Sequence, residues 1–128
     1  MSPTEFTWAG RARSFVHAAH GLRVLYAEHN SKIHLTATLA VIGLALALGV
    51  GRSEWIALVL AMSGVWTAEA LNTAVEQVCD AVTREAHPGI QAAKDVAAAA
   101  VLIAAAGALA VGALVFVPHL LRLIASAS

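Results

Sequence analysis

The sequence predicts an all-α membrane protein in which an N-terminal amphipathic surface helix precedes three transmembrane helices. Of its 128 residues, 59% are hydrophobic and only 12% are charged, and the mean hydropathy is +0.75. This composition is too apolar for an ordinary soluble domain. The charged residues are gathered in short segments between long apolar stretches. No linker or internal repeat divides the chain, so residues 1–128 are expected to form a single membrane-embedded domain.

The first predicted element is a surface helix over about residues 5–31. Aromatic and aliphatic side chains alternate here with arginines and histidines, a pattern typical of helices that lie at the membrane interface. The first residues contain charged side chains and no apolar core of a signal peptide, so no signal peptide is predicted.

Three transmembrane spans are expected over about residues 33–50, 54–82 and 95–117. The first is interrupted only by His34, Thr36 and Thr38, and it is just long enough to cross about 30 Å of hydrocarbon. A glycine-containing turn precedes the second span, and Pro88 and Gly89 are expected to break the helix before the third.

The third span carries small residues at every fourth position: Ala100, Ala104, Ala108 and Gly112. Small-residue stripes of this kind let membrane helices approach one another closely. An alanine-rich helix also produces such a stripe by chance, so close packing along it is one of two interpretations.

The distribution of basic residues predicts the orientation in the membrane. One side carries six of the eight: Arg11, Arg13, Arg23, Lys32, Arg84 and Lys94. Only Arg52 and Arg122 fall on the other. The positive-inside rule therefore places the N-terminus in the cytoplasm and the C-terminus outside.

The equal numbers of basic and acidic residues form no basic patch and argue against nucleic acid as a partner. The single cysteine, Cys79, excludes an internal disulfide and a cysteine-based zinc site.

The second span contains a row of polar side chains that an apolar environment does not explain. Glu69, Asn72, Glu76 and Asp80 lie at i, i+3, i+7 and i+11, so they share one stripe of a helix. Polar groups in hydrocarbon cost about 2.5–3.5 kcal/mol each, which makes such a row functional by default. If Trp55 marks the outer interface, Glu69 lies about 21 Å further in. This depth suits a reaction between a lipid held in the bilayer and a soluble reagent from the cytoplasm.

The stripe and the start of the third span together contain the groups that phosphoryl transfer from ATP requires. Lys94 and Asp95, at the start of the third predicted span, are expected to lie at a depth similar to that of Glu76. Carboxylates can hold Mg²⁺, a lysine can neutralise phosphate charge, and a further carboxylate can take a proton from an attacking hydroxyl. No P-loop or glycine-rich kinase loop is present, so helix side chains are expected to hold the nucleotide.

Two motifs resemble those of the prokaryotic integral-membrane diacylglycerol kinase family. They are Glu69-x-x-Asn72-Thr73-Ala74-x-Glu76-x-x-x-Asp80, and His87-Pro88 followed by Ala93-Lys94-Asp95-x-Ala97-Ala98. The resemblance covers nearly the whole chain. Three further segments are more similar to the undecaprenol kinase branch: Arg13-Ser14-Phe15-Val16-His17-Ala18 with Gly21-Leu22, Glu28-x-Asn30-x-x-Ile33-His34, and Lys94-Asp95.

The resemblance implies a homotrimer whose active sites form between neighbouring subunits. It implies Glu69 as the general base and Glu28 and Glu76 as ligands of Mg²⁺. The residues that position the nucleotide and metal are then Asn72, Glu76, Asp80, Lys94 and Asp95. The interval from Gly21 to Glu28 is one residue shorter than is usual for the family, and one residue turns a helix by about 100°.

Three functions remain in competition. The first is an ATP-dependent lipid kinase that phosphorylates undecaprenol, or alternatively diacylglycerol. The second is a small oligomeric conductor of protons or cations, with the carboxylate stripe lining a pore. The stripe does not reach the outer half of the membrane, where residues 56–68 offer only Ser63 and Thr67 as polar groups of modest strength. The third, a non-catalytic membrane subunit, leaves the stripe unexplained.

Overall fold

A computed structural model describes residues 7–127 and confirms the predicted all-α fold. These residues form four helices: α1 (Trp8–Ala27), α2 (His29–Leu48), α3 (Arg52–Val82) and α4 (Pro88–Ser126). Helices α2, α3 and α4 are each long and apolar enough to cross a membrane. Residues 5 and 6 of the expected surface helix lie outside the part of the chain that the structure describes.

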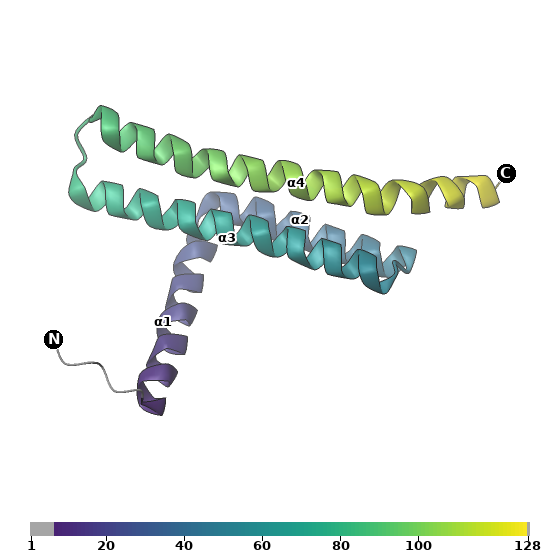
Figure 1. Ribbon diagram of the computed structural model, residues 1–128, viewed down its shortest axis with the longest axis horizontal. Helices are drawn as coiled ribbons and strands as arrows, with labels where there is room; N and C mark the ends of the chain where they lie inside the picture. Colours follow the sequence, from purple (N-terminus) through teal and green to yellow (C-terminus); the bar gives the residue numbers. More distant parts are fainter. Residues whose placement is uncertain (1–6, 128) are drawn as a thin grey trace.

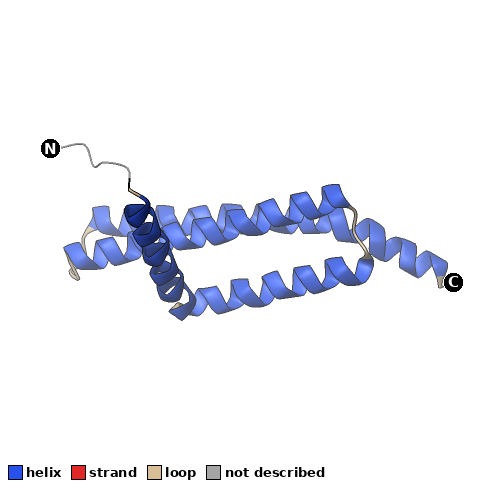
Figure 2. Ribbon diagram, turned by 90° about the horizontal axis from the view of Figure 1, so that it is seen from below, coloured by secondary structure: helices blue, strands red, loops and turns tan. Residues whose placement is uncertain are grey.

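Helices α3 and α4 lie side by side and antiparallel, and α2 runs along α3 (Figure 1). Helix α1 leaves the bundle at a steep angle near the start of α2 (Figure 1). The second view shows α1 lying across that end of the bundle and α4 extending beyond the turn between α2 and α3 (Figure 2). This arrangement agrees with a surface helix attached to three parallel or antiparallel spans.

The boundary between α1 and α2 falls at Glu28, earlier than the expected end of the surface helix near residue 31. Glu28 has φ −69° and ψ 144°, an extended conformation. A steep change of direction needs a residue outside the helical region, which is why two helices replace one here. Leu25 and Thr73 are buried where α1 meets α3.

The opposite end of the bundle is the best packed. Gly49 adopts φ 63° at the end of α2, a left-handed conformation that glycine takes without steric cost. Side chains from α2, the turn, α3 and α4 form a core there: Ala45, Val50, Leu58, Val115 and Phe116. His119 Nε2 lies 3.0 Å from Glu54 Oε1 at this end, so α4 is also tied to the start of α3 by a polar contact.

Helix α4 is longer at both ends than the span expected over residues 95–117. Pro88 occupies its first turn instead of breaking it, because a proline there loses only an N–H that has no helical partner. Pro118 lies inside the helix, as is tolerated in membrane spans when neighbouring groups compensate for the lost hydrogen bond. Within the small-residue stripe, Ala104, Ala108 and Gly112 are half-buried, whereas Ala100 is exposed.

Candidate active site

The four polar residues predicted to share a stripe of α3 differ in their exposure. Glu69 and Asn72 are buried, with 2% and 6% of their surface exposed, Glu76 is half-buried, and Asp80 is exposed. Glu69 and Asp80 are about 16 Å apart along the helix axis. The stripe therefore runs from a closed interior to an open helix end, as a reaction between a buried and a soluble substrate requires.

Glu69 is the most enclosed of these groups. Its side chain is 3% exposed, and its Oε2 atom lies 3.6 Å from Nε2 of His34 on α2. Removing a carboxylate from water costs several kcal/mol unless good partners compensate. A single histidine beyond hydrogen-bonding distance compensates this cost only weakly. A catalytic role therefore explains the burial of Glu69 better than a contribution to the stability of the fold does.

Asn72 and Glu76 are joined one helical turn further along. Asn72 Nδ2 donates a hydrogen bond to Glu76 Oε1 at 3.3 Å. Asn72 Oδ1 is buried and has no hydrogen-bond partner among the described residues. The pair thus presents a carboxylate beside an unpaired amide oxygen.

These oxygens suit a Mg²⁺ ion that accompanies a nucleotide. Between residues 7 and 127, no group of three or more His, Cys, Asp or Glu side chains is placed to hold a metal ion. Magnesium needs no such cage, because it is usually bound by one or two carboxylates together with substrate phosphates and water. The carboxylate of Glu76 and the free oxygen of Asn72 are compatible with this mode of binding.

Asp80 and Lys94 connect the end of α3 to the start of α4. Lys94 Nζ donates to Asp80 Oδ1 at 2.5 Å, and the two side chains are 32% and 59% exposed. Asp95 lies next to Lys94 and accepts a hydrogen bond from Gln91 Nε2 at 2.8 Å. The lysine and aspartates expected to position a nucleotide therefore lie where a soluble substrate reaches them.

Glu28 occupies the elbow between α1 and α2 and is exposed. Its side chain has no hydrogen bond or ion pair with another described residue. The structure brings together Asn72 with Glu76 and Asp80 with Lys94, but it forms no such contact for Glu28. The assignment of Glu28 as a metal ligand stays a prediction.

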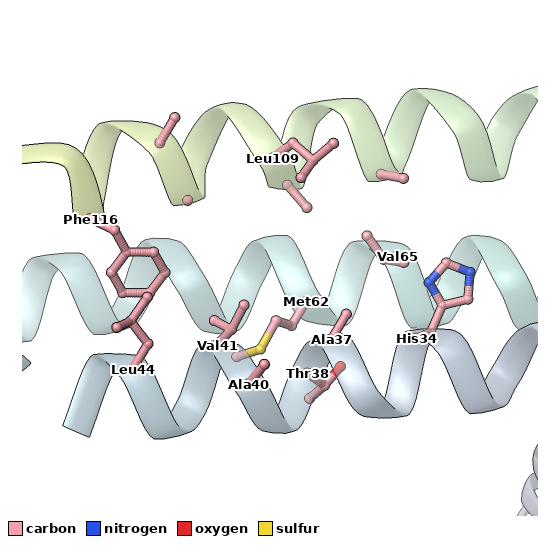
Figure 3. A pocket seen from close by; sticks show the side chains of 14 residues that line it. His34, Ala37, Thr38, Ala40, Val41, Leu44, Met62, Val65, Leu109 and Phe116 are labelled. Carbon is pink, nitrogen blue, oxygen red and sulfur yellow. The ribbon is translucent and has the colours of Figure 1, made fainter. Parts of the chain in front are cut away.

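An apolar groove of about 540 Å³ lies between α2, α3 and α4. His34 stands at one end and Leu44 and Phe116 stand at the other, as Figure 3 shows. The segment of α2 from His34 to Leu44 spans about 15 Å. This groove was not predicted, because it depends on the placement of three helices that are distant in the sequence.

No part in the site was predicted for His34 or Trp66. Trp66 Nε1 donates to Thr38 Oγ1 at 3.0 Å and so links α3 to α2. Its ring also contacts Tyr26 edge to face, with the centroids 5.5 Å apart. The sequence did contain a signal for His34, because it is an ionisable residue within an apolar span. Such residues are rare in membrane helices and usually functional.

Comparison with known proteins identifies the family. Residues 16–116 match the family model described as prokaryotic diacylglycerol kinase. An undecaprenol kinase from Bacillus subtilis is 37% identical over 109 residues, which cover 84% of this chain and 89% of that protein. A diacylglycerol kinase from Synechocystis sp. PCC 6803 is 38% identical over 112 residues, covering 86% of this chain and 64% of that protein.

The matched region contains the stripe on α3, the Asp80–Lys94 pair and the groove. Both relatives are named as kinases of lipid alcohols, which confirms the enzyme prediction and gives no support to an ion conductor. The buried carboxylate, the apolar groove and the exposed lysine are the features that such an enzyme needs. The chain belongs to the prokaryotic diacylglycerol kinase family and is a membrane lipid kinase that uses ATP as its phosphoryl donor.

Proposed function

We propose that this enzyme transfers the γ-phosphoryl group of ATP to undecaprenol and forms undecaprenyl phosphate, with Mg²⁺ as the cofactor. The observation that carries the proposal is the buried carboxylate of Glu69 beside His34, at one end of an apolar groove. A lipid alcohol lying in the groove presents its hydroxyl at this end. The 37% identity to an undecaprenol kinase supports the same substrate.

The chemistry of the groove favours a polyprenol over diacylglycerol. Of its fourteen lining residues, only His34 and Thr38 have side chains that form conventional hydrogen bonds. The hydroxyl of Thr38 accepts from Trp66 and keeps its one donor, so the groove offers at most two donors to the three oxygen acceptors that lie close together in diacylglycerol. Diacylglycerol carries two ester carbonyls close to its hydroxyl, and burying such an acceptor without a donor costs about 1–3 kcal/mol. Undecaprenol is hydrocarbon up to its hydroxyl and avoids this cost.

The residues of the stripe then have distinct tasks. Glu69 takes the proton of the lipid hydroxyl as the hydroxyl oxygen attacks the γ-phosphorus. Asn72 and Glu76 would hold the Mg²⁺ ion together with Glu28. The ion would supply positive charge that neutralises the phosphates.

The open end of the site holds the nucleotide. Lys94 neutralises phosphate charge, and Asp80 keeps the lysine side chain directed toward the site through their 2.5 Å contact. Asp95 contributes to positioning the nucleotide and the metal. Positioning and electrostatics supply most of the rate in such a transfer.

The same arrangement supports the proposed orientation, in which the N-terminus is cytoplasmic and the C-terminus outside. The α3–α4 turn, which Lys94 follows, lies on the same side of the bundle as α1 and beyond the point where α1 attaches, whereas the start of α3 at Arg52 and the last part of α4 with Arg122 lie toward the other end (Figure 1). ATP then reaches Lys94 from the cytoplasm, and the positive-inside rule gives the same orientation.

We further propose that the enzyme is a homotrimer with active sites shared between neighbouring subunits. Within one subunit Asp80, Asp95 and Glu28 are exposed, so a single chain leaves the open end of the site uncovered. Long apolar side chains of α4 are also exposed: Leu102, Ile103, Leu109 and Leu114. A second subunit can cover part of this surface and complete the site.

The test is transfer of labelled γ-phosphate from Mg-ATP, by the purified protein in mixed micelles, to undecaprenol and diacylglycerol offered in parallel. We expect a higher kcat/KM for undecaprenol. A higher kcat/KM for diacylglycerol would contradict the proposed substrate and leave the lipid kinase assignment in place. Transfer to neither would contradict the proposed reaction, and ion flux through protein-containing liposomes without nucleotide would then favour the conductor.

A further inference from the structure

His34 separates the apolar groove from the buried carboxylate of Glu69. It lines the groove, as Figure 3 shows, and its side chain is 20% exposed. The side chain of Glu69 is 3% exposed and does not line the groove. A hydroxyl that moves along the groove therefore meets the imidazole of His34 before it reaches the carboxylate.

Contacts with neighbouring helices fix the position of the His34 ring. It packs edge to face against Trp66, with the centroids 6.2 Å apart. Trp66 is in turn held by its hydrogen bond to Thr38 and by the ring of Tyr26. Helices α1, α2 and α3 thus all contribute to the placement of the imidazole, and Nε2 is directed toward Glu69.

The distance between the two groups suits a third atom placed between them. Nitrogen and oxygen atoms 3.6 Å apart are too distant for a good hydrogen bond, which has a length of about 2.7–3.2 Å. A hydroxyl oxygen can lie about 2.8 Å from both at once. Because a hydroxyl both donates and accepts, it can donate to the carboxylate and accept from an imidazole N–H.

We propose that His34 and Glu69 together bind the hydroxyl of the lipid acceptor, and that His34 donates to the hydroxyl oxygen from Nε2. This inference rests on the proposed function and adds a substrate-binding residue from α2. During transfer the hydroxyl proton moves to Glu69 as the oxygen forms its bond to the γ-phosphorus. The bond from that phosphorus to the bridging oxygen breaks, and ADP leaves with the electron pair. His34 keeps its proton throughout and fixes the direction of attack.

Two substitutions with opposite hydrogen-bonding capacity test the proposal. His34→Leu fills similar space in an apolar span without a donor, and His34→Gln places an amide N–H at a similar reach. We expect His34→Leu to lower kcat/KM for undecaprenol about ten- to hundredfold, the effect of one lost hydrogen bond to a reacting group. His34→Gln should stay within about threefold of the unchanged protein, and the KM for ATP should be the same in all three.

A second measurement isolates binding from chemistry. The affinity for undecaprenol without nucleotide should be lower in His34→Leu than in the unchanged protein and restored in His34→Gln. Leu35→Ala, which removes apolar volume one residue away from the groove lining, serves as the control and should change neither quantity. Helix content and oligomer size, measured for each variant, show that the fold is intact.

The possible failures are distinguishable. If the unchanged protein phosphorylates no lipid alcohol, the proposed function is wrong and this inference is wrong with it. If the unchanged protein and His34→Leu phosphorylate undecaprenol with equal kcat/KM, only the role of His34 is wrong. Equal losses in His34→Leu and His34→Gln, with both variants folded, would also contradict a role as hydrogen-bond donor.

Discussion

The ammonium group of Lys94 lies 2.5 Å from Oδ1 of Asp80 and so joins the start of α4 to the end of α3. Both side chains are substantially exposed, and exposed ion pairs contribute little to stability. The value of the contact lies in the position it gives the lysine. It places the positive charge at the open end of the stripe that begins at Glu69, where we propose that the phosphate groups of ATP bind.

Exchanging the two charges separates a nucleotide-binding role of Lys94 from a structural one. Lys94→Ala should raise the KM for ATP at least about tenfold, because a charge-assisted contact to phosphate is lost. The double variant Asp80→Lys with Lys94→Asp restores the ion pair but moves the positive charge from α4 to α3. We expect it to stay as impaired as Lys94→Ala in steady-state assays. Recovery of the original KM would show that the pair is structural.

Narrowing the groove should impair use of the lipid without affecting use of ATP. Ala37 lines the groove from α2 and is exposed, so Ala37→Phe places a ring in the space that the lipid occupies. We expect kcat/KM for undecaprenol to fall about tenfold or more while the KM for ATP is unchanged. Leu39→Phe enlarges an exposed side chain on the same helix outside the groove. If Ala37→Phe and Leu39→Phe have the same kcat/KM for undecaprenol, the groove does not hold the substrate.

The hydrogen bond from Trp66 to Thr38 should contribute to both stability and activity. Thr38→Val keeps the shape of the side chain but leaves the indole N–H without its acceptor, at a cost of about 1–3 kcal/mol. Because Trp66 also supports the ring of His34, the rate of lipid phosphorylation should fall as well. The measurements are unfolding in mixed micelles and kcat for undecaprenol.

Thr36→Val is the matched control for this prediction. The hydroxyl of Thr36 donates to the carbonyl of Lys32 within the same helix at 2.9 Å and links no two helices. We expect this variant to retain both the stability and the activity of the unchanged protein. A Thr38→Val variant that equals Thr36→Val in both measurements would mean that the contact with Trp66 is dispensable.

The contact between His119 and Glu54 should stabilise the protein without affecting catalysis. It lies at the end of the bundle opposite the Asp80–Lys94 pair, and Glu54 is about 22 Å from Glu69 along α3. His119→Leu removes the partner and leaves the hydrogen bond from the Gly51 N–H to Glu54 Oε2 in place. Thermal unfolding should begin at a lower temperature, while kcat below that temperature is unchanged. A changed kcat would mean that this end of the bundle is coupled to the active site.

The helices and the polar stripe could be predicted because both depend on local sequence. Hydrophobicity identifies a span, and a helical repeat places Glu69 and Glu76 on one face without reference to any other segment. The break at Glu28 was missed because no glycine or proline marks it. It follows from the packing of α1 on α3, which the sequence of α1 alone does not show. Pro88 was predicted to break a helix, but it lies in the first turn of α4. The effect of a proline depends on its position relative to the helix start, and the sequence did not show where α4 begins.

The contact of His34 with Glu69 depends on the register between α2 and α3, which are separated by a turn. Thr38 faces Trp66 and His34 faces Glu69, a pairing that only the folded arrangement reveals. The groove needs a third helix as well. The sequence therefore predicted the polar stripe of α3, and the structure adds the wall of α2 against which we propose that the lipid lies.

We propose that the buried carboxylate of Glu69 activates the lipid hydroxyl. Glu69→Gln keeps the size of the side chain and removes its ability to take a proton, so the direct test is γ-phosphoryl transfer from Mg-ATP to undecaprenol by this variant. We expect a loss of about 10²–10⁴-fold in kcat, with lipid affinity and oligomer size unchanged. A kcat for Glu69→Gln equal to that of the unchanged protein would contradict it.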